Sequence, residues 1–325
     1  MKRGIVIGKF YPPHKGHKYL IERGCAQVDQ LTVIVCDHKA QKIPAQLRAA
    51  WLKEMVPQAQ VLVVEDCIPD DDSKGWADYT VKVLRYVPDV VFTSEDYGDA
   101  YARFMGAKHI QVDKERKTVP IAARQIRSDP LKYWDYLEPC VRGYFAKRVC
   151  VLGAESSGTT TMVQALAEHF KTSWVPEFGH EYSIAKIQAS DYEKWDTEEF
   201  IFIARRQNSL EDLLARECNK ILICDTDSFA TSFWHERYMG FISPELEALS
   251  RGRYYDMYFL TDVNIPFVQD GTRDGEHIRH SMHERFKEEL TKRNKRFILL
   301  SGSNEARMKQ AIKICNQALS EIRLL

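Results

Sequence analysis

The sequence lacks both a net charge and a long hydrophobic run. Its 46 lysines and arginines balance 46 aspartates and glutamates, which removes the usual electrostatic argument for a nucleic-acid partner or an anionic membrane surface. The N-terminus, MKRGIVIGKFYPP, meets glycine and proline after a few apolar residues, so it is neither a signal peptide nor a membrane span. We therefore expect a cytoplasmic protein with no nucleic-acid or membrane partner, which acts on small molecules.

The sequence also lacks paired cysteines, repeats and low-complexity tracts. Its eight cysteines show no CxxC spacing, and several, such as Cys150 and Cys224, lie inside apolar runs. They are expected to be buried free thiols in a reducing compartment. What is present is a core-forming composition, 44% apolar and 11% aromatic, which excludes a disordered, collagen-like or coiled-coil chain.

Short β-rich runs alternate with longer helical segments along the chain. The strand candidates are residues 4–8, 31–35, 61–64 and 90–92, then, after a restart, 148–153, 221–224, 256–260 and 296–300. Such alternation predicts βαβ units and parallel sheets. We therefore predict an α/β protein of two tandem parallel-sheet domains, residues 1–146 and 147–325, closed by an amphipathic helix from Asn304 to Leu325.

The first candidate site follows the first strand. Residues 8–17 read GKFYPPHKGH and precede an apolar-periodic helix, which places His14 and His17 at the carboxyl end of a strand, where open parallel sheets bind ligands. Gly16 allows close backbone approach, and the two imidazoles can hydrogen-bond a polyphosphate, more strongly if they are protonated. An HxGH string can arise by chance, but this context favours a triphosphate site.

A later segment adds a cation to this site. Residues 119–127 read VPIAARQIR and precede another predicted helix. We expect Arg127 in the first turn of that helix, where its guanidinium can bind the β- and γ-phosphates.

The second candidate site is a phosphate loop that lacks its lysine. Residues 153–160 read GAESSGTT, which is the glycine spacing of a loop whose N–H groups converge on phosphate, with Thr160 placed to bind Mg²⁺. Thr159 occupies the position that lysine normally holds. The predicted phosphate-binding residues are Gly153, Ser156, Ser157, Gly158, Thr159, Thr160 and Thr161.

Two later features support this second site. An apolar strand ends in Asp225 and Asp227, a Walker-B-like arrangement in which Asp225, with Thr160, can hold Mg²⁺ and the acids can orient an attacking hydroxyl. Residues 268–279 are polar and contain Gly, Arg273 and Arg279, as expected of a lid that closes cations over phosphate. An exposed charged loop is the alternative for this segment.

The motifs together resemble a known family. The HxGH string with a later arginine resembles the nucleotidyltransferases that adenylylate small phosphorylated acceptors. Adding residues 93–98 (TSEDYG), 112–116 (VDKER), 133–136 (YWDY) and 175–182 (VPEFGHEY), the whole chain resembles the bifunctional NadR family of nicotinamide mononucleotide adenylyltransferases and ribosylnicotinamide kinases.

The resemblance implies a Rossmann-like nucleotidyltransferase domain followed by a P-loop kinase domain. It implies transfer of AMP from ATP to nicotinamide mononucleotide, giving NAD and pyrophosphate without a covalent intermediate, and phosphorylation of nicotinamide riboside with ATP and Mg²⁺. His14 and His17 would stabilise the developing charge, and Arg127 the pyrophosphate. The remaining expected ligand contacts are Gly8, Lys9 and Phe10 for ATP and Trp76, Tyr97, Glu177 and Tyr182 for substrate; Trp76 can equally be a core residue.

The sequence departs from the family pattern at several positions. Ala122 and Arg124 stand where a small hydroxyl residue and a threonine are usual, and His180 and Phe267 replace an expected arginine and tryptophan. With Thr159, these changes leave open a second domain that is a weakly active or non-catalytic nucleotide sensor. An adenylyltransferase for another phosphorylated acceptor and a homo-oligomer also stay open. Because the chain starts at the catalytic strand, we expect no helix-turn-helix domain and no transcriptional control.

Overall fold

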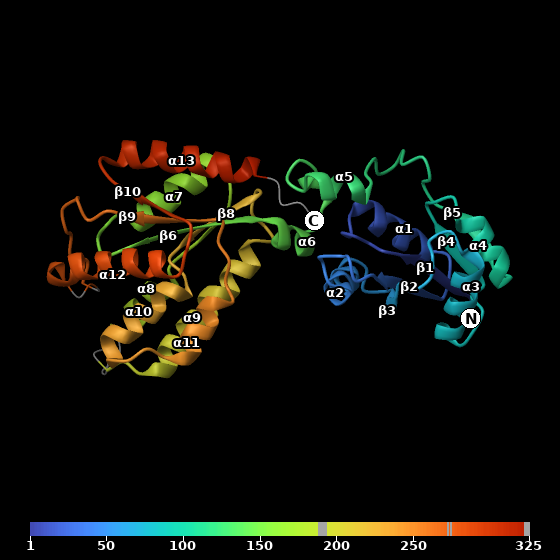
Figure 1. Ribbon diagram of the computed structural model, residues 1–325, viewed down its shortest axis with the longest axis horizontal. Coiled ribbons are helices and arrows are strands. Elements are labelled where there is room, and N and C mark those ends of the chain that lie inside the picture. Colours follow the sequence, from blue (N-terminus) through green and yellow to red (C-terminus); the bar gives the residue numbers. More distant parts are fainter. Residues whose placement is uncertain (188–193, 272, 274, 322–325) are drawn as a thin grey trace. The chain divides into compact units, whose positions relative to one another are not determined.

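The chain forms two compact α/β units. The computed structural model describes residues 1–187, 194–271, 273 and 275–321, and contacts divide them into residues 1–142 and 143–321 (Figure 1). The division lies within α6 (Pro139–Phe145), just before the domain boundary expected at residue 146.

The first unit is built on a parallel five-stranded sheet in the order β3-β2-β1-β4-β5. Its strands are β1 (Arg3–Gly8), β2 (Gln30–Asp37), β3 (Gln60–Glu65), β4 (Val90–Thr93) and β5 (Lys108–Gln111). The strand order reverses at β1, which pairs with both β2 and β4. Ligands bind at such a switch point, outside the carboxyl ends of the strands.

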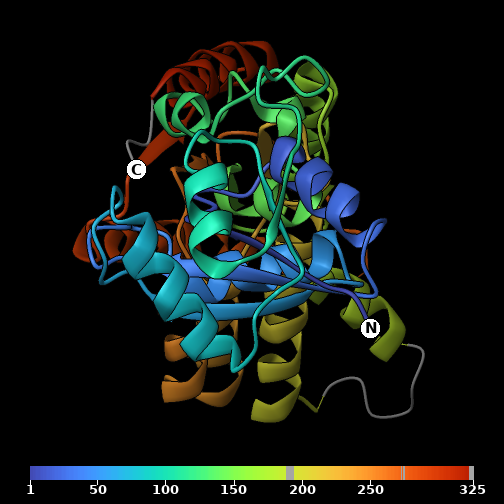
Figure 2. The same cartoon turned by 90° about the vertical axis from the view of Figure 1, so that its right-hand side faces the viewer.

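Helices cover both faces of this sheet (Figure 2). They are α1 (Lys15–Cys25), α2 (Ala45–Met55), α3 (Ser73–Leu84), α4 (Gly98–Met105), α5 (Ala123–Ser128) and the 3₁₀ turn η1 (Trp134–Tyr136). Because both faces are covered, β1, β2 and β4 consist of nearly continuous apolar residues rather than alternating ones.

The second unit repeats the architecture with the order β10-β9-β6-β8-β7, again all parallel. Its strands are β6 (Lys147–Gly153), β7 (Trp174–Val175), β8 (Ile221–Asp225), β9 (Met257–Thr261) and β10 (Phe297–Leu300). Its helices are α7 (Thr159–Phe170), α8 (Phe178–Ile187), α9 (Thr197–Leu214), α10 (Ser228–Met239), α11 (Pro244–Arg251), η2 (Glu276–Ile278), α12 (Arg279–Lys292) and α13 (Asn304–Ser320).

The predicted α/β fold with two parallel sheets is confirmed, and all eight predicted strands are present. Two further strands, β5 and β7, were not predicted; both are short edge strands, and β5 is the polar run KHIQ. The closing helix ends at Ser320, and the predicted last turn at 322–325 lies outside the described residues.

All eight cysteines are free, and six of them are buried; Cys25 is partly buried and Cys67 is exposed. Of the helices that the structure describes, none has the length and apolar character needed to cross a membrane.

Candidate active sites

The two histidines of the first unit lie where β1 turns into α1. The His14 ring caps the helix, since its Nδ1 accepts a hydrogen bond from the Gly16 amide at 3.0 Å. The neutral ring therefore carries its proton on Nε2, which makes Nε2 a donor. A Cβ on Gly16 would lie only 2.9 Å from His14 Cε1, so glycine is required for this arrangement.

Both imidazoles are neutral in the unliganded protein. The rings stack with their centroids 3.8 Å apart, and Phe10 meets His17 edge-on at 5.0 Å. Burial, reinforced by the nearby positive charge of Arg116, lowers the pKa of His17 to about 3 and holds the pKa of His14 well below its usual value. Near pH 7 the pair therefore offers N–H donors, not the imidazolium charges considered from the sequence.

Two arginines hold the loop that precedes the histidines. Arg48 is fully buried and donates to the carbonyls of Lys9 and Cys36, the latter at 3.2 Å. Arg127 Nη1 donates to the carbonyl of Tyr11 at 2.6 Å, and its guanidinium lies 5.3 Å from the centre of the Tyr11 ring. Arg48 was not predicted from the sequence, because its partners are backbone groups distant in the chain.

The expected position of Arg127 in its helix was wrong. Arg127 lies in the last turn of α5 rather than the first. The helix begins earlier than predicted, where the Gln125 side chain accepts a hydrogen bond from the Ala122 amide at 2.9 Å. It also ends early, because Pro130 disfavours a helical conformation at Asp129.

The other predicted residues of the first unit have structural partners. Lys9 Nζ contacts the carboxylate of Asp70 at 2.8 Å, and the Tyr97 hydroxyl donates to the carbonyl of Ile7 at 3.0 Å, next to Gly8 at the end of β1. Trp76 is only 9% exposed, and its indole N–H donates to the Pro69 carbonyl at 3.1 Å. This burial suits a core residue, and stacking of Trp76 on substrate stays a prediction.

The second unit holds a cavity of about 490 Å³ beside its phosphate loop. The loop between β6 and α7 depends on its glycines: Gly158 has φ +86°, and a Cβ on Gly153 would lie 2.0 Å from Thr261 Oγ1. Ser157 is buried, with its hydroxyl 2.6 Å from that of Thr261. Of the predicted phosphate contacts, Gly153, Ser156, Thr159 and Thr160 line the cavity, whereas exposed Thr161 does not.

The predicted metal pair lies together at this cavity. Thr160 Oγ1 donates to Asp225 Oδ2 at 2.5 Å, while the buried Oδ1 of Asp225 has no hydrogen-bond partner within the described part of the chain. Burial raises the pKa of Asp225 to about 6. An unpartnered carboxylate oxygen beside a hydroxyl fits Mg²⁺, which takes few protein ligands and completes its shell with water and phosphate; no larger cluster of metal-ligating side chains occurs among the described residues.

Glu177 and an aromatic wall line the same cavity. Burial, with the neighbouring carboxylates of Asp225 and Glu155, raises the pKa of Glu177 to about 8. The aromatic lining residues are Trp174, Trp195, Phe200, Trp234 and Tyr238, and none of them was predicted from the sequence. Tyr182 does not line the cavity itself. Its hydroxyl donates to Glu199 Oε1 at 2.9 Å, and its ring centroid lies 6.1 Å from that of Trp195.

Asp225, the last residue of β8, and Asp227 have different environments, so the expectation that the two acids act together was wrong. Asp227 is fully buried, accepts from the Ala230 amide at 3.0 Å and the Tyr258 hydroxyl at 2.8 Å, and does not line the cavity. It caps α10. A turn at Thr226, with φ +63°, separates the two carboxylates.

The predicted lid contributes one arginine to the cavity. Arg273 lines it and is paired with Asp270 at 2.9 Å. Arg279 is 3% exposed and donates instead to the carbonyls of Ile265 at 2.7 Å and Ser156 at 2.9 Å. Thr272 and Asp274, also in the predicted lid, lie outside the described residues.

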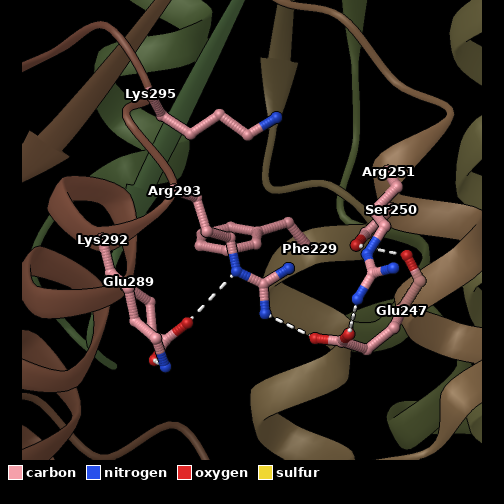
Figure 3. Close-up of a pocket in the computed structure, with 8 residues that line it drawn as sticks. All are labelled: Phe229, Glu247, Ser250, Arg251, Glu289, Lys292, Arg293 and Lys295. Atoms are coloured by element: carbon pink, nitrogen blue, oxygen red, sulfur yellow. Dashed lines mark hydrogen bonds and ion pairs between the residues drawn. The ribbon is translucent and has the colours of Figure 1, made fainter.

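A further cavity of about 430 Å³ lies between the ends of α11 and α12 (Figure 3). Its central cation, Arg293, is already bound to Glu247 at 2.6 Å and to Glu289 at 3.1 Å, and Glu247 also holds Arg251 at 2.6 Å. Because carboxylates neutralise these guanidinium groups, this cavity is a poor phosphate site.

Comparisons with known proteins match the two halves of the chain to different families. Residues 5–152 match the cytidylyltransferase-like family and residues 148–307 match an AAA domain family. The fold matches two crystal structures of NadR protein, one in complex with NAD and AMP-PNP and one with NR. Their TM-scores are 0.77 and 0.80 at 20% identity, over 100% and 99% of this chain and 98% of each of those chains.

Curated relatives extend the match to the sequence. The chain is 28% identical to the trifunctional NAD biosynthesis/regulator protein NadR of Escherichia coli, over 98% of this chain and 84% of the relative. A nicotinamide-nucleotide adenylyltransferase of Pyrobaculum neutrophilum is 30% identical over 43% of this chain and 84% of its own length. The NadR of Salmonella typhimurium is 30% identical over 90% of this chain and 76% of its own length. With this extent of similarity and both phosphate corners in place, the chain belongs to the NadR family.

Proposed function

We propose that the first unit makes NAD and pyrophosphate from nicotinamide mononucleotide and ATP, and that the second unit phosphorylates nicotinamide riboside with ATP. The observation that carries the proposal is the presence, in one member of the NadR family, of two separate phosphate corners: the histidine pair after β1 and the glycine loop after β6. The relatives' names support NAD biosynthesis and nicotinamide-nucleotide adenylylation.

In the first unit, the phosphate oxygen of the mononucleotide attacks the α-phosphorus of ATP, and the bond to the β-phosphate oxygen breaks. The protein acts by positioning and by stabilising charge. His14 caps the N-terminus of α1 and His17 lies in its first turn, so that both rings would donate to a triphosphate bound at this helix end. Arg127 holds the Tyr11 carbonyl and brings a cation to the same loop, where the pyrophosphate charge develops.

In the second unit, the 5′-hydroxyl of the riboside attacks the γ-phosphorus, and ADP leaves. Thr160 and Asp225 would hold Mg²⁺, which neutralises phosphate charge when bound. Glu177 lies in the same cavity and can accept the hydroxyl proton once a cation nearby favours its charged form. The aromatic wall and the surrounding carboxylates suit a flat, cationic pyridinium ring.

Two assays test the proposal on the intact chain. Nicotinamide mononucleotide with ATP and Mg²⁺ should yield NAD and pyrophosphate in equal amounts. Riboside with ATP should yield one ADP for each riboside consumed, and the mononucleotide formed should go on to NAD and pyrophosphate through the first unit. A chain that uses pantetheine phosphate or flavin phosphate, and not the mononucleotide, would overturn the first half.

The absence of the loop lysine supports a second candidate function for the second unit. Thr159 brings no cation to a site whose chemistry is largely electrostatic, which suits a unit that binds nucleotide with little turnover. Riboside phosphorylation that is absent in the wild type and appears in Thr159→Lys would favour this sensor function over the kinase.

A further inference from the structure

Two arginines lie beneath the phosphate loop of the second unit. Arg279, the first residue of α12, and Arg307, in the first turn of α13, are 3% and 1% exposed. They lie on different helices, and both donate to carbonyls of the loop between β6 and α7. Neither is part of the glycine motif.

Among the described residues, the hydrogen-bond partners of Arg307 are all uncharged. Its Nη1 donates to the Ser157 carbonyl and its Nη2 to the Asp262 carbonyl, both at 2.9 Å. Its Nε donates to the Gly302 carbonyl at 3.1 Å, and Nη2 also contacts the side-chain oxygen of Asn264. The guanidinium thus joins the phosphate loop to the carboxyl ends of β9 and β10.

Arg279 has the same kind of environment. Its two terminal nitrogens donate to the carbonyls of Ser156 and Ile265, and its buried Nε has no hydrogen-bond partner among the residues that the structure describes. In the part of the chain that the structure describes, neither Arg279 nor Arg307 forms a salt bridge. Asp262 and the exposed Glu276 act on them only at longer range.

A buried charge with no carboxylate in direct contact is costly, and the described residues place two such charges here. Burial lowers the pKa of both guanidinium groups. The positive charge of Arg279 lowers the pKa of Arg307 further, and that of Arg273 lowers the pKa of Arg279. Binding of an anion in the positive potential of these two guanidinium groups would offset this cost. The space above the loop is the triphosphate position of the proposed kinase.

We propose that Arg279 and Arg307 supply, from behind the phosphate loop, the positive potential that the loop lacks at Thr159, and so act as positioning residues for the triphosphate. Each guanidinium polarises a peptide through its carbonyl, which strengthens the N–H on the other side of the same peptide as a donor. Arg307 acts on the peptide from Ser157 to Gly158 and so on the Gly158 N–H. Arg279 acts on the peptide from Ser156 to Ser157, whose N–H donates to the Ala154 carbonyl at 3.2 Å, so that it stabilises the turn of the loop and adds its charge from there. This inference rests on the proposed kinase function of the second unit.

The experiment is a double-mutant cycle between Arg307→Met and Thr159→Lys, read out as the KM for ATP in riboside phosphorylation. Arg307→Met should raise this KM by about 10- to 100-fold, the range of a charge-assisted hydrogen bond. In the Thr159→Lys background the same change should cost less than about threefold, because a direct cation replaces the indirect one. A purely structural role would give the same loss in both backgrounds.

Two further variants separate the effect of the Arg307 charge from a general loss of arginine in this unit. Arg307→Lys retains the charge and should keep the KM closer to wild type than Arg307→Met does. Arg293→Met removes an arginine of the same unit whose charge Glu247 and Glu289 already neutralise (Figure 3), so it should leave the KM for ATP within about twofold. Thermal unfolding of each variant and adenylyl transfer by the first unit, measured on the same chains, report folding.

The outcomes separate the inference from the proposed function. A robust wild-type kinase whose KM for ATP is unchanged in Arg307→Met, or whose loss is equal in both backgrounds, overturns the inference alone. A wild-type chain that neither phosphorylates riboside nor binds AMP-PNP in its second unit overturns both.

Discussion

Removal of the His17 imidazole is expected to abolish adenylyl transfer and also to make the protein less sensitive to acid. The ring stacks on His14, and its buried Nδ1 has no hydrogen-bond partner in the described residues of the unliganded protein. Loss of one such donor to transition-state charge costs about 10²–10³ in kcat. His17→Ala should therefore lose NAD formation from the mononucleotide and ATP to that extent, while riboside phosphorylation by the same chain continues.

The acid sensitivity follows from the pKa of about 3 that burial imposes on His17. An unfolded histidine takes up its proton below pH 6.5, whereas the folded ring does not until about pH 3, so the depressed pKa costs stability as the pH falls through this window. At pH 5 the cost is at most about 2 kcal/mol, because the ring keeps some contact with solvent. His17→Ala removes it.

Urea unfolding at pH 7.5 and pH 5 measures this difference. Between the two values, the wild type should lose up to about 2 kcal/mol more stability than His17→Ala does. His17→Asn, which restores a donor, should recover part of the activity, and the exposed His169→Ala should match the wild type in both assays. Near-full activity of His17→Ala would refute the first site, and an identical pH dependence in both proteins would refute the desolvation of His17.

Three further outcomes are expected. Arg273→Ala should lose riboside phosphorylation, because Arg273 is the lid arginine that lines the cavity; a robust activity unchanged in this variant would place the needed cation elsewhere. The raised pKa of Glu177 makes the folded wild type bind a proton that the unfolded chain has lost, so the stability of the protein should fall as the pH rises from about 5 to about 8. Chemical unfolding measured across this range should not show the same decline in Glu177→Gln. Trp76→Ala should lose about 3–5 kcal/mol of stability if Trp76 is a core residue, whereas a variant of unchanged stability with a raised KM for the mononucleotide would indicate stacking on substrate.

Much of the architecture is determined locally and was predictable. Strands such as β1, β6 and β8 are apolar runs ended by glycine or a polar residue, and burial between two helical layers requires such runs. The two ligand corners were predictable for the same reason, because a histidine cap or a glycine turn acts on amides within a few residues. The Thr160 and Asp225 pair followed from the rule that carboxyl ends of parallel strands meet at one edge.

The tertiary structure alone decided which polar groups the long and buried side chains meet. The bounds of α5 place Arg127 in its last turn. Tyr258 of β9 donates a hydrogen bond to Asp227 in the core, whereas Asp225 lines the cavity. Arg307 reaches a carbonyl 150 residues earlier in the chain. Hydrophobic periodicity reports whether a face is buried, but a guanidinium or carboxylate is satisfied by whichever donor or acceptor the packed fold brings within 3 Å, and sequence spacing carries no record of that partner.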